Sequence, residues 1–261
     1  MSQSTMSSLP GAAGAGNAIA LYARPSANFA AKLERSKQLL REAEATYSPL
    51  TQASSLGVED MVITELIHQT GIQTRIFVLE TGQLHAETVA LLDTLQKHYG
   101  REVDVYRPVA ADADAFVTKN GAEAMYQSLA LRKECCDIRK TRPLALALAG
   151  KKGWLTGLRR EQSNARAEVS EVEQQPERAK INPIVDWTWG DVWHFVQQHN
   201  IPTNPLHDQF MPSIGCAPCT RAIAVGEDFR AGRWWWEDSS KECGLHVDGG
   251  KPKIIPIKES A

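Results

Sequence analysis

The spacing of apolar residues changes several times along the first half of the chain, and each change predicts a different element. From Phe29 to Tyr47 apolar side chains recur at helical spacing among Lys, Arg and Glu, which predicts an amphipathic helix. Short apolar runs typical of strands follow at residues 49–54, 75–80 and 102–108. Helical patterns, each ended by a glycine, separate these runs and cover residues 59–70 and 84–99.

Strands that alternate with helices in this way predict an α/β fold, a doubly wound, mainly parallel sheet with helices on both faces. Further along, residues 154–163 follow another strand, the acidic run 168–177 is most simply a solvated loop, and residues 181–200 resume as a strand and a Trp-rich helix. Ligands of such sheets bind at the carboxyl ends of the strands. The loops at 54–60, 80–85 and 154–163 are therefore expected to converge on one pocket.

Composition adds limits to this picture. The chain has 261 residues and a net charge of −2, so no overall field favours nucleic acid or a membrane surface. The first twenty residues contain no Lys or Arg and no apolar core of a secretory signal, which predicts a flexible arm over residues 1–27. No apolar run approaches the roughly 18 residues that span a bilayer. The longest candidate, residues 144–149, is expected to be a buried helical turn.

The chain has five cysteines, and this odd number without a signal peptide indicates a reducing compartment, which we take to be the cytoplasm. The oligomeric state is left open, a homo-oligomer included. We expect one nucleotide- and cluster-binding domain over residues 28–229, followed by a mobile C-terminal segment over residues 230–261.

The loop SSLGVED, residues 54–60, has the outline of an anion-binding loop. Ser54 and Ser55 end a strand, Gly57 allows a close turn, and the free amides at the start of the next helix suit an anion. An ordinary capped turn explains such an isolated pattern equally simply. The loop lacks the lysine of a Walker sequence and carries Glu59 and Asp60, which indicates a nucleotide without β and γ phosphates.

Arg159 and Arg160 directly follow a predicted strand and a glycine. Paired guanidinium hydrogen bonds from this place can hold a phosphate or a sulfate. The alternative is two arginines exposed to solvent. Their place at a strand end favours binding.

Four cysteines occur as two pairs, Cys135 with Cys136 and Cys216 with Cys219. A disulfide between neighbours closes a strained ring, and a single tetrahedral zinc ion suits adjacent cysteines poorly. A 4Fe-4S cluster is larger and presents separate iron corners, so four thiolates of this kind favour one such cluster. The basic residues around the first pair are placed to balance its charge of about −2 from one helical turn away. They are Arg132, Lys133, Arg139 and Lys140.

The fifth cysteine, Cys243, lies in a polar, glycine-bearing segment with His246 three residues later. This setting is typical of an accessible, reactive thiol rather than of a buried one. Arg230 and Arg233 precede it and can bind the anion that the thiolate attacks.

In order and spacing, the segments SSLGVED, LETGQLHAET, KECCDIRKTRPL, WLTGLRREQS, CAPCTRA and KECGLH resemble the iron-sulfur branch of the phosphoadenylylsulfate reductase family, the assimilatory adenylylsulfate reductases. The resemblance covers residues 29–246. It implies the adenine nucleotide alpha hydrolase-like fold and reduction of adenosine 5′-phosphosulfate to sulfite and AMP, in sulfate assimilation and cysteine biosynthesis. It also implies thioredoxin, or a glutaredoxin-like reductant, as the electron donor.

The resemblance further implies roles for single residues. Cys243 would be the catalytic nucleophile that carries an S-sulfocysteine intermediate, and the other four cysteines would ligate the cluster. Residues toward the phosphosulfate group would be Lys140, Arg230, Arg233 and His246. Those that hold the nucleotide would be Ser54, Ser55, Gly57, Leu79, Glu80, Thr81 and one of Arg159 and Arg160.

Three alternatives stay open at this point. A reductase of the same family can use the 3′-phosphorylated substrate, although such enzymes usually lack the cluster cysteines. A thiolation enzyme that cleaves ATP to AMP and carries an iron-sulfur cluster would need a different first loop. A zinc-binding module with four cysteine ligands would have no catalytic activity.

Overall fold

The computed structural model describes residues 18–163 and 166–237, and in this part of the chain six strands form one sheet. The strand order is β3-β2-β1-β4-β6-β5. The strands are β1 (Leu50–Ser54), β2 (Arg75–Leu79), β3 (Val103–Tyr106), β4 (Gly153–Leu155), β5 (Val172–Gln174) and β6 (Ala179–Ile181). All neighbours pair in parallel except β5 and β6. The predicted mainly parallel sheet is therefore confirmed.

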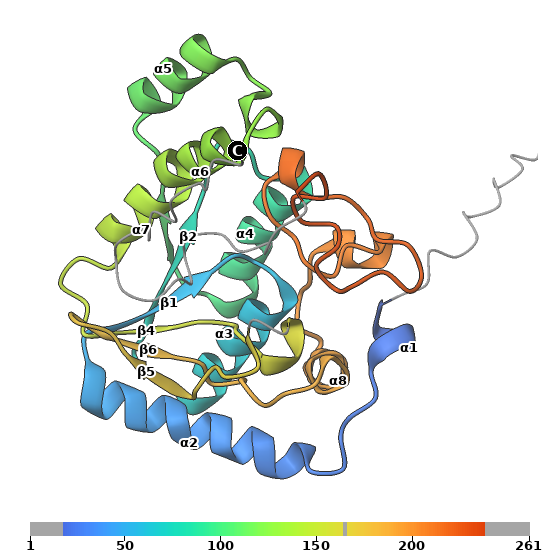
Figure 1. Cartoon of the computed structure of the whole chain (residues 1–261). Coiled ribbons are helices and arrows are strands. Elements are labelled where there is room, and N and C mark those ends of the chain that lie inside the picture. The colour runs from blue at the N-terminus through green and yellow to red at the C-terminus, as the bar shows by residue number, and fades with distance from the viewer. Residues whose placement is uncertain (1–17, 164–165, 238–261) are drawn as a thin grey trace, which may run out of the picture.

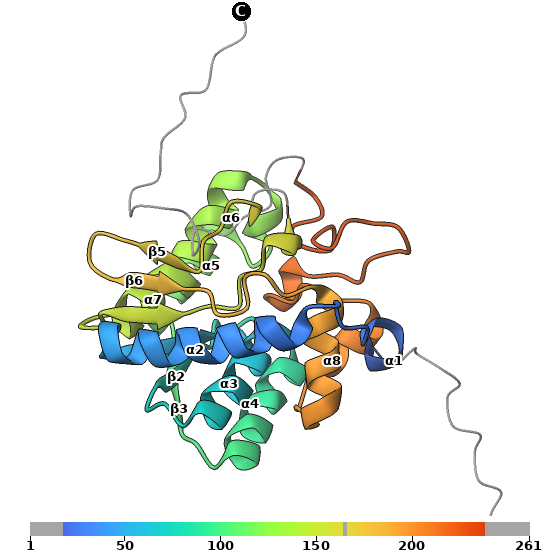
Figure 2. The same cartoon turned by 90° about the horizontal axis from the view of Figure 1, so that it is seen from below.

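Helices cover both faces of this sheet (Figure 1). The α-helices are α1 (Ala18–Tyr22), α2 (Phe29–Tyr47), α3 (Val58–Thr70), α4 (Ala86–Tyr99), α5 (Ala110–Asn120), α6 (Leu129–Cys136), α7 (Arg142–Ala147) and α8 (Trp189–His199). Helices α2, α3, α4 and α8 contribute to one large apolar core (Figure 2). Helix α7 packs on the other face, where Leu144 and Ala147 contact Phe77 and Trp154 of the strands.

The predicted helix ends are also confirmed. Helix α3 starts after Gly57 and stops at Gly71, and α4 stops at Gly100. Gly71 and Gly100 adopt the left-handed conformation, with φ of 72° and 58°, which glycine reaches at low cost.

Two expectations about the rest of the chain were wrong in part. The acidic run 168–177 contains strand β5, because residues 172–174 pair antiparallel with β6 and extend the sheet by one edge strand. In the run 144–149, Ala147 and Leu148 are buried as predicted, but Leu146 is 62% exposed because it faces away from the sheet.

The two ends of the described part both pack against the domain. Helix α1 lies within the stretch expected to be a flexible arm. It contacts α8, and the Ala18 amide donates at 2.6 Å to Asp208 of the short helix η5, Pro205–Gln209. Residues 230–237 of the C-terminal segment are also described, whereas Cys243 and His246 lie outside the described residues. No described helix is long and apolar enough to cross a membrane.

Helices α6 and α7 are joined by the π-helix η2, Asp137–Thr141. A π-turn is rare and often occurs at functional sites. Here it carries Arg139 and Lys140, and it follows directly on Cys135 and Cys136 at the end of α6.

Candidate active site

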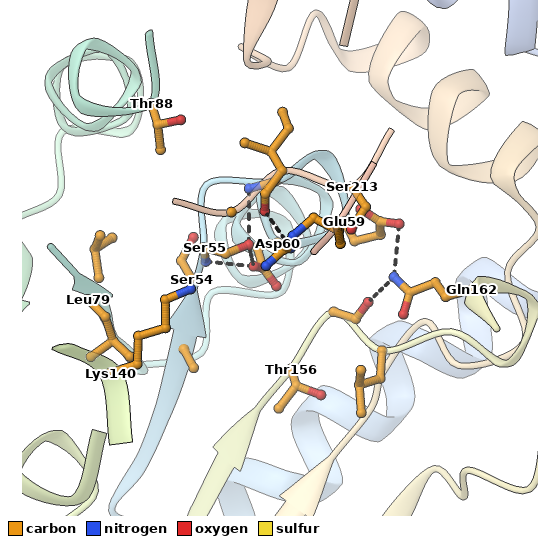
Figure 3. A pocket seen from close by; sticks show the side chains of 18 of the residues that line it. Ser54, Ser55, Glu59, Asp60, Leu79, Thr88, Lys140, Thr156, Gln162 and Ser213 are labelled. Carbon is orange, nitrogen blue, oxygen red and sulfur yellow. Dashed lines mark hydrogen bonds between the residues drawn. The ribbon is translucent and has the colours of Figure 1, made fainter. Parts of the chain in front are cut away.

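A cavity opens at the carboxyl ends of β1, β2 and β4 (Figure 3). The loops at 54–60, 80–85 and 154–163 all line it, so their predicted convergence is confirmed. The segments 212–215 and 229–234 complete the wall.

Eight of the residues predicted to bind the substrate line this cavity. They are Ser54, Ser55, Gly57, Leu79, Thr81, Lys140, Arg230 and Arg233. The Lys140 side chain extends toward Ser54 and Ser55 in Figure 3. Glu80 is not part of the wall. It accepts the Gly82 amide at 2.8 Å and pairs with Arg107.

The first loop is held by a buried carboxylate that sequence reasoning did not assign to the site. Asp60 accepts hydrogen bonds from the Ser55 amide at 2.7 Å and the Ser55 hydroxyl at 2.6 Å. Burial raises the pKa of Asp60 to about 6, although these hydrogen bonds act in the opposite direction. The loop after β4 lies very close, because a Cβ on Gly157 would lie 2.5 Å from the Asp60 carboxylate.

Arg159 binds a carboxylate of the protein itself. Its guanidinium lies 3.0 Å from Glu59 and is almost completely buried. Gln162 donates to the same Glu59 oxygen at 3.0 Å (Figure 3). This network ties the loop after β4 to the start of α3, and Arg159 itself does not line the cavity.

Arg160 is also outside the cavity wall, where it pairs with Asp186 and donates to the Val169 carbonyl at 2.8 Å. The cavity-lining arginine of this region is Arg166, which follows a few residues later. The assignment of Arg159 or Arg160 to the substrate thus stays a prediction. The arginines after the strand correctly indicated that this loop borders the cavity.

His207 is a further wall residue that no sequence pattern indicated. Its Nε2 accepts the Val58 amide at 3.3 Å, and its Nδ1 lies 3.0 Å from the Met211 carbonyl. These partners require the neutral ring with the proton on Nδ1. Burial lowers the pKa of His207, while the charge of Glu59 raises it. The ring thereby caps the first turn of α3 beside the cavity.

The two cysteine pairs meet in a second, smaller cavity. Cys135, Cys136, Cys216 and Cys219 all line it, and none of these thiols is in a disulfide. Cys135 and Cys136 come from the end of α6. Cys216 precedes the short helix η6, Ala217–Cys219, and Cys219 is its last residue. The second pair is held by the loop after β2, because the Ala217 amide donates to Gln83 at 2.7 Å.

Cations and donors surround these cysteines. Burial raises the pKa of Cys216, but Lys140, the Thr81 hydroxyl at 3.3 Å and Arg233 outweigh it, so the net shift is downward. Burial and the neighbouring thiols instead raise the pKa of Cys219 to about 12. Of the basic residues predicted to balance the charge, only Lys133 is exposed to solvent.

The donor set and one unpaired group suit a cluster. Four thiol sulfurs are soft ligands of the kind that iron-sulfur clusters take. Trp234 lines the same cavity, and its buried indole Nε1 has no hydrogen-bond partner among the described residues. Among the described residues no group of three or more His, Cys, Asp or Glu side chains is arranged to hold a single metal ion.

Lys140 and Trp234 line both cavities, so the two sites share a wall. Arg233 lines the first cavity next to this shared wall. Its guanidinium lies 4.6 Å from the centre of the Trp234 ring and donates to the Ile214 carbonyl at 3.2 Å.

A mainly parallel sheet with helices on both faces and a cavity at its carboxyl edge defines an α/β protein of the doubly wound class. Residues 49–222 match the phosphoadenosine phosphosulfate reductase domain, and the chain belongs to this family.

Curated relatives agree in sequence over most of their length. The chain is 49% identical over 236 residues to the adenosine 5′-phosphosulfate reductase of Burkholderia cepacia, which covers 89% of this chain and 93% of the relative. It is 48% identical to the protein of the same name from Allochromatium vinosum, over 83% of this chain and 84% of the relative.

A solved structure shows the same fold. The phosphoadenylyl-sulfate reductase of Candida auris, in a phosphate complex, superposes with a TM-score of 0.61 at 22% identity, over 74% of this chain and 97% of that chain.

Proposed function

We propose that this protein reduces adenosine 5′-phosphosulfate to sulfite and AMP in assimilatory sulfate reduction. Two of its relatives carry the name adenosine 5′-phosphosulfate reductase, which supports the choice of substrate. The observation that carries the proposal is the shared wall. A cavity whose first loop suits an anion, and whose lining cations include Lys140, Arg230 and Arg233, adjoins a cavity with four cysteines.

The nucleotide would lie along the carboxyl edge of the sheet. Phe77, Leu144 and Trp154 supply an apolar part of the cavity that suits a purine. The amides of the first loop and the three cations suit the phosphosulfate end.

Cys243 would then carry the chemistry. Its thiolate attacks the sulfur of the phosphosulfate, a sulfur–sulfur bond forms, the sulfur–oxygen bond to AMP breaks, and AMP leaves with the electron pair. Charge develops on the departing phosphate, so fixed cations stabilise this step.

A dithiol protein of the thioredoxin or glutaredoxin class completes the cycle. One of its thiolates attacks the Cys243 sulfur and expels sulfite, and its second thiol releases Cys243 while the pair is oxidised to a disulfide. Two electrons thus pass from the dithiol to the sulfur. A reducing cytoplasm supplies such a partner.

The four cysteines would hold one 4Fe-4S cluster. When bound, the cluster supplies a fixed net charge of about −2 beside the substrate cavity. Lys140 is placed to interact with the Cys216 sulfur on one side and the substrate on the other, and the Trp234 Nε1–H would gain a sulfur acceptor.

The 3′-phosphorylated nucleotide is the second candidate, because the matching domain takes its name from a reductase of that substrate. Glu59 and Asp60 line the cavity and disfavour an additional phosphate. Turnover with each sulfonucleotide separates the two, and a clear preference for the 3′-phosphorylated form would reject our assignment. ATP cleavage to AMP would instead reveal a thiolation enzyme.

The decisive experiment is mass spectrometry of the protein after incubation with substrate and without reductant. Wild type is expected to gain about 80 Da, the mass of SO₃ on the attacked thiol. Cys243→Ser is expected to keep its iron and its AMP affinity and to gain nothing. An adduct that persists in this variant would refute the role of Cys243.

A further inference from the structure

A buried ion pair connects the cysteine-bearing helix to the end of the described C-terminal segment. Arg132, on α6, donates to both carboxylate oxygens of Glu237 at 2.8 Å. The side chains of both residues are almost completely buried, 2% and 7% exposed. The two positions are 105 residues apart in the chain.

The pair is part of a stack around one indole ring. The guanidinium groups of Arg132 and Arg233 both lie 4.6 Å from the centre of the Trp234 ring. The carboxylate of Glu237 balances one of these two charges. Arg132 also interacts with Cys136, so the stack extends to the cavity of the four cysteines.

A buried ion pair adds little to the free energy of unfolding. Burial removes two charges from water, and this desolvation offsets most of their attraction, so an apolar pair of similar volume serves stability equally well. The better attested use of a buried ion pair is to specify one arrangement of the chain. A bidentate arginine restricts both the distance and the direction of the carboxylate.

What the arrangement specifies follows from the sequence position of Glu237. It lies six residues before Cys243. A chain of six residues spans at most about 20 Å, so a fixed Glu237 sets an upper limit on the reach of the Cys243 thiol. Arg132 and Glu237 do not line the substrate cavity, so neither residue is part of the binding wall itself.

We propose that Arg132 and Glu237 are positioning residues that anchor the start of the reactive C-terminal segment. The anchor rests on the proposed function, because it has a purpose only if Cys243 attacks the substrate. It keeps the thiol near the substrate for the first step and near the same surface when the dithiol protein arrives for the second.

The anchor makes a quantitative prediction. Without it, the nearest preceding residue whose backbone is bonded to the rest of the domain is the buried Trp234, whose amide donates to the Cys219 carbonyl at 3.3 Å, and the tether to Cys243 grows from six residues to nine. The effective concentration of a tethered group falls with about the −3/2 power of tether length, which gives a loss of about twofold. Without the ion pair the chain at residue 237 also loses its fixed direction, which should lower the rate further, so twofold is the smallest loss that we expect.

The test uses Glu237→Gln in the full-length, cluster-loaded protein, because glutamine keeps the size and Glu237 does not line the cysteine cavity. Adduct formation on Cys243 is timed in a single turnover at saturating adenosine 5′-phosphosulfate without reductant. We expect the rate to fall at least about twofold. The dissociation constant of AMP and the iron content should stay at wild-type values, which a merely structural role does not predict.

Two further variants are matched controls. Arg35→Gln breaks a bidentate pair with Glu171 on the surface, away from both cavities, and should leave the rate unchanged. The double variant Arg132→Gln with Glu237→Gln should be no slower than the slower single variant, because the two residues act as one unit.

Three results would overturn the proposal. A wild-type rate in Glu237→Gln would reject the anchor and leave the proposed function intact. Loss of iron in Glu237→Gln would show that the ion pair serves to maintain the cysteine cavity, which Arg132 lines, and not to position Cys243. If wild type itself forms no adduct, the proposed function fails and the anchor fails with it.

Discussion

At the scale of single residues, Gly215 shows how a position without a side chain sets the place of a charge. A Cβ at this position would lie 2.3 Å from Nη2 and 2.4 Å from Cζ of Arg233. The Arg233 guanidinium can therefore lie against the turn that leads into Cys216 only because residue 215 is glycine. Sequence reasoning had noted Arg233 but not this dependence, which involves no pattern along the chain.

We expect Gly215→Ala to displace Arg233 and to raise KM for the sulfonucleotide about tenfold or more, because a hydrogen bond to a charged group contributes about 1.5–3 kcal/mol. Steady-state kinetics with iron content as a check would measure this. Val225→Ala is the control, since that side chain is fully exposed in a nearby loop. An unchanged KM in Gly215→Ala would show that Arg233 does not contact the substrate.

Some of the residues predicted to bind the substrate line the cavity because of the path of the backbone. Ser54, Ser55 and Gly57 lie in the cavity because the end of a parallel strand leads there. Arg159 does not line the cavity, because its guanidinium forms an ion pair with Glu59 at 3.0 Å. Which charge finds which partner depends on three-dimensional neighbours, and in this case the neighbours are 100 positions apart.

At the scale of elements, α8 illustrates how one carboxylate joins several segments. Asp191 and Thr188 form a capping box at the start of the helix. Asp191 also accepts from Lys32 at 2.8 Å and from the Ser26 amide at 2.6 Å, so it holds the chain before α2. Burial raises the pKa of Asp191, but Lys32 and the amides of Ser26 and Thr188 outweigh burial and lower the pKa to about 2.

We expect Asp191→Asn to lower the free energy of unfolding by about 2 kcal/mol at pH 7, the value of a pKa depressed from 3.8 to about 2. A carboxylate whose pKa is lowered by folding stabilises the fold at pH values above its pKa in the unfolded chain, and this stabilisation is lost as the pH falls through the folded-state pKa. The difference between variant and wild type should therefore shrink as the pH falls from about 4 toward 2.

Urea denaturation at several pH values would measure this. Asp186→Asn is the matched control, because its pair with Arg160 is half exposed and should contribute less than about 1 kcal/mol. Equal losses in the two variants would contradict the special role of Asp191.

Elements with a strong periodic pattern were predictable, and short polar ones were not. The long helix α2 and the alternation from β1 to β3 follow from apolar spacing alone. Strand β5 was missed because Val172, Glu173 and Gln174 have no apolar alternation. These residues become a strand only because β6 offers them an edge to pair with. The π-turn after α6 likewise has no signature in residue spacing.

At the scale of the whole molecule, the fold brings together two pairs of cysteines that are separated by 79 intervening residues. The first pair ends α6, and the second is held against the loop after β2 by the bridge between Leu84 and Cys216. The same loop borders the substrate cavity through Thr81. One loop thus aligns both sites.

We expect Cys219→Ala to lose the iron and the broad visible absorption of anaerobically purified protein, because a three-cysteine cavity holds a 4Fe-4S cluster incompletely. Iron analysis and the visible spectrum measure this directly. Cys243→Ser, which leaves all four of the other cysteines in place, should keep both. A colourless wild-type preparation with stoichiometric zinc would reject the cluster.

The sequence by itself determined the alternation of elements, the carboxyl edge of the sheet as the ligand site, and the residue types that carry the chemistry. These depend on local spacing and on the few connections that parallel strands allow. Only the tertiary structure decided that Lys140 and Trp234 separate two adjoining cavities and that Arg159 is neutralised by Glu59. It also decided that Arg132 forms an ion pair with Glu237. The partner of a buried charge depends on distance and solvation in the folded protein, and neither can be read from the order of residues along the chain.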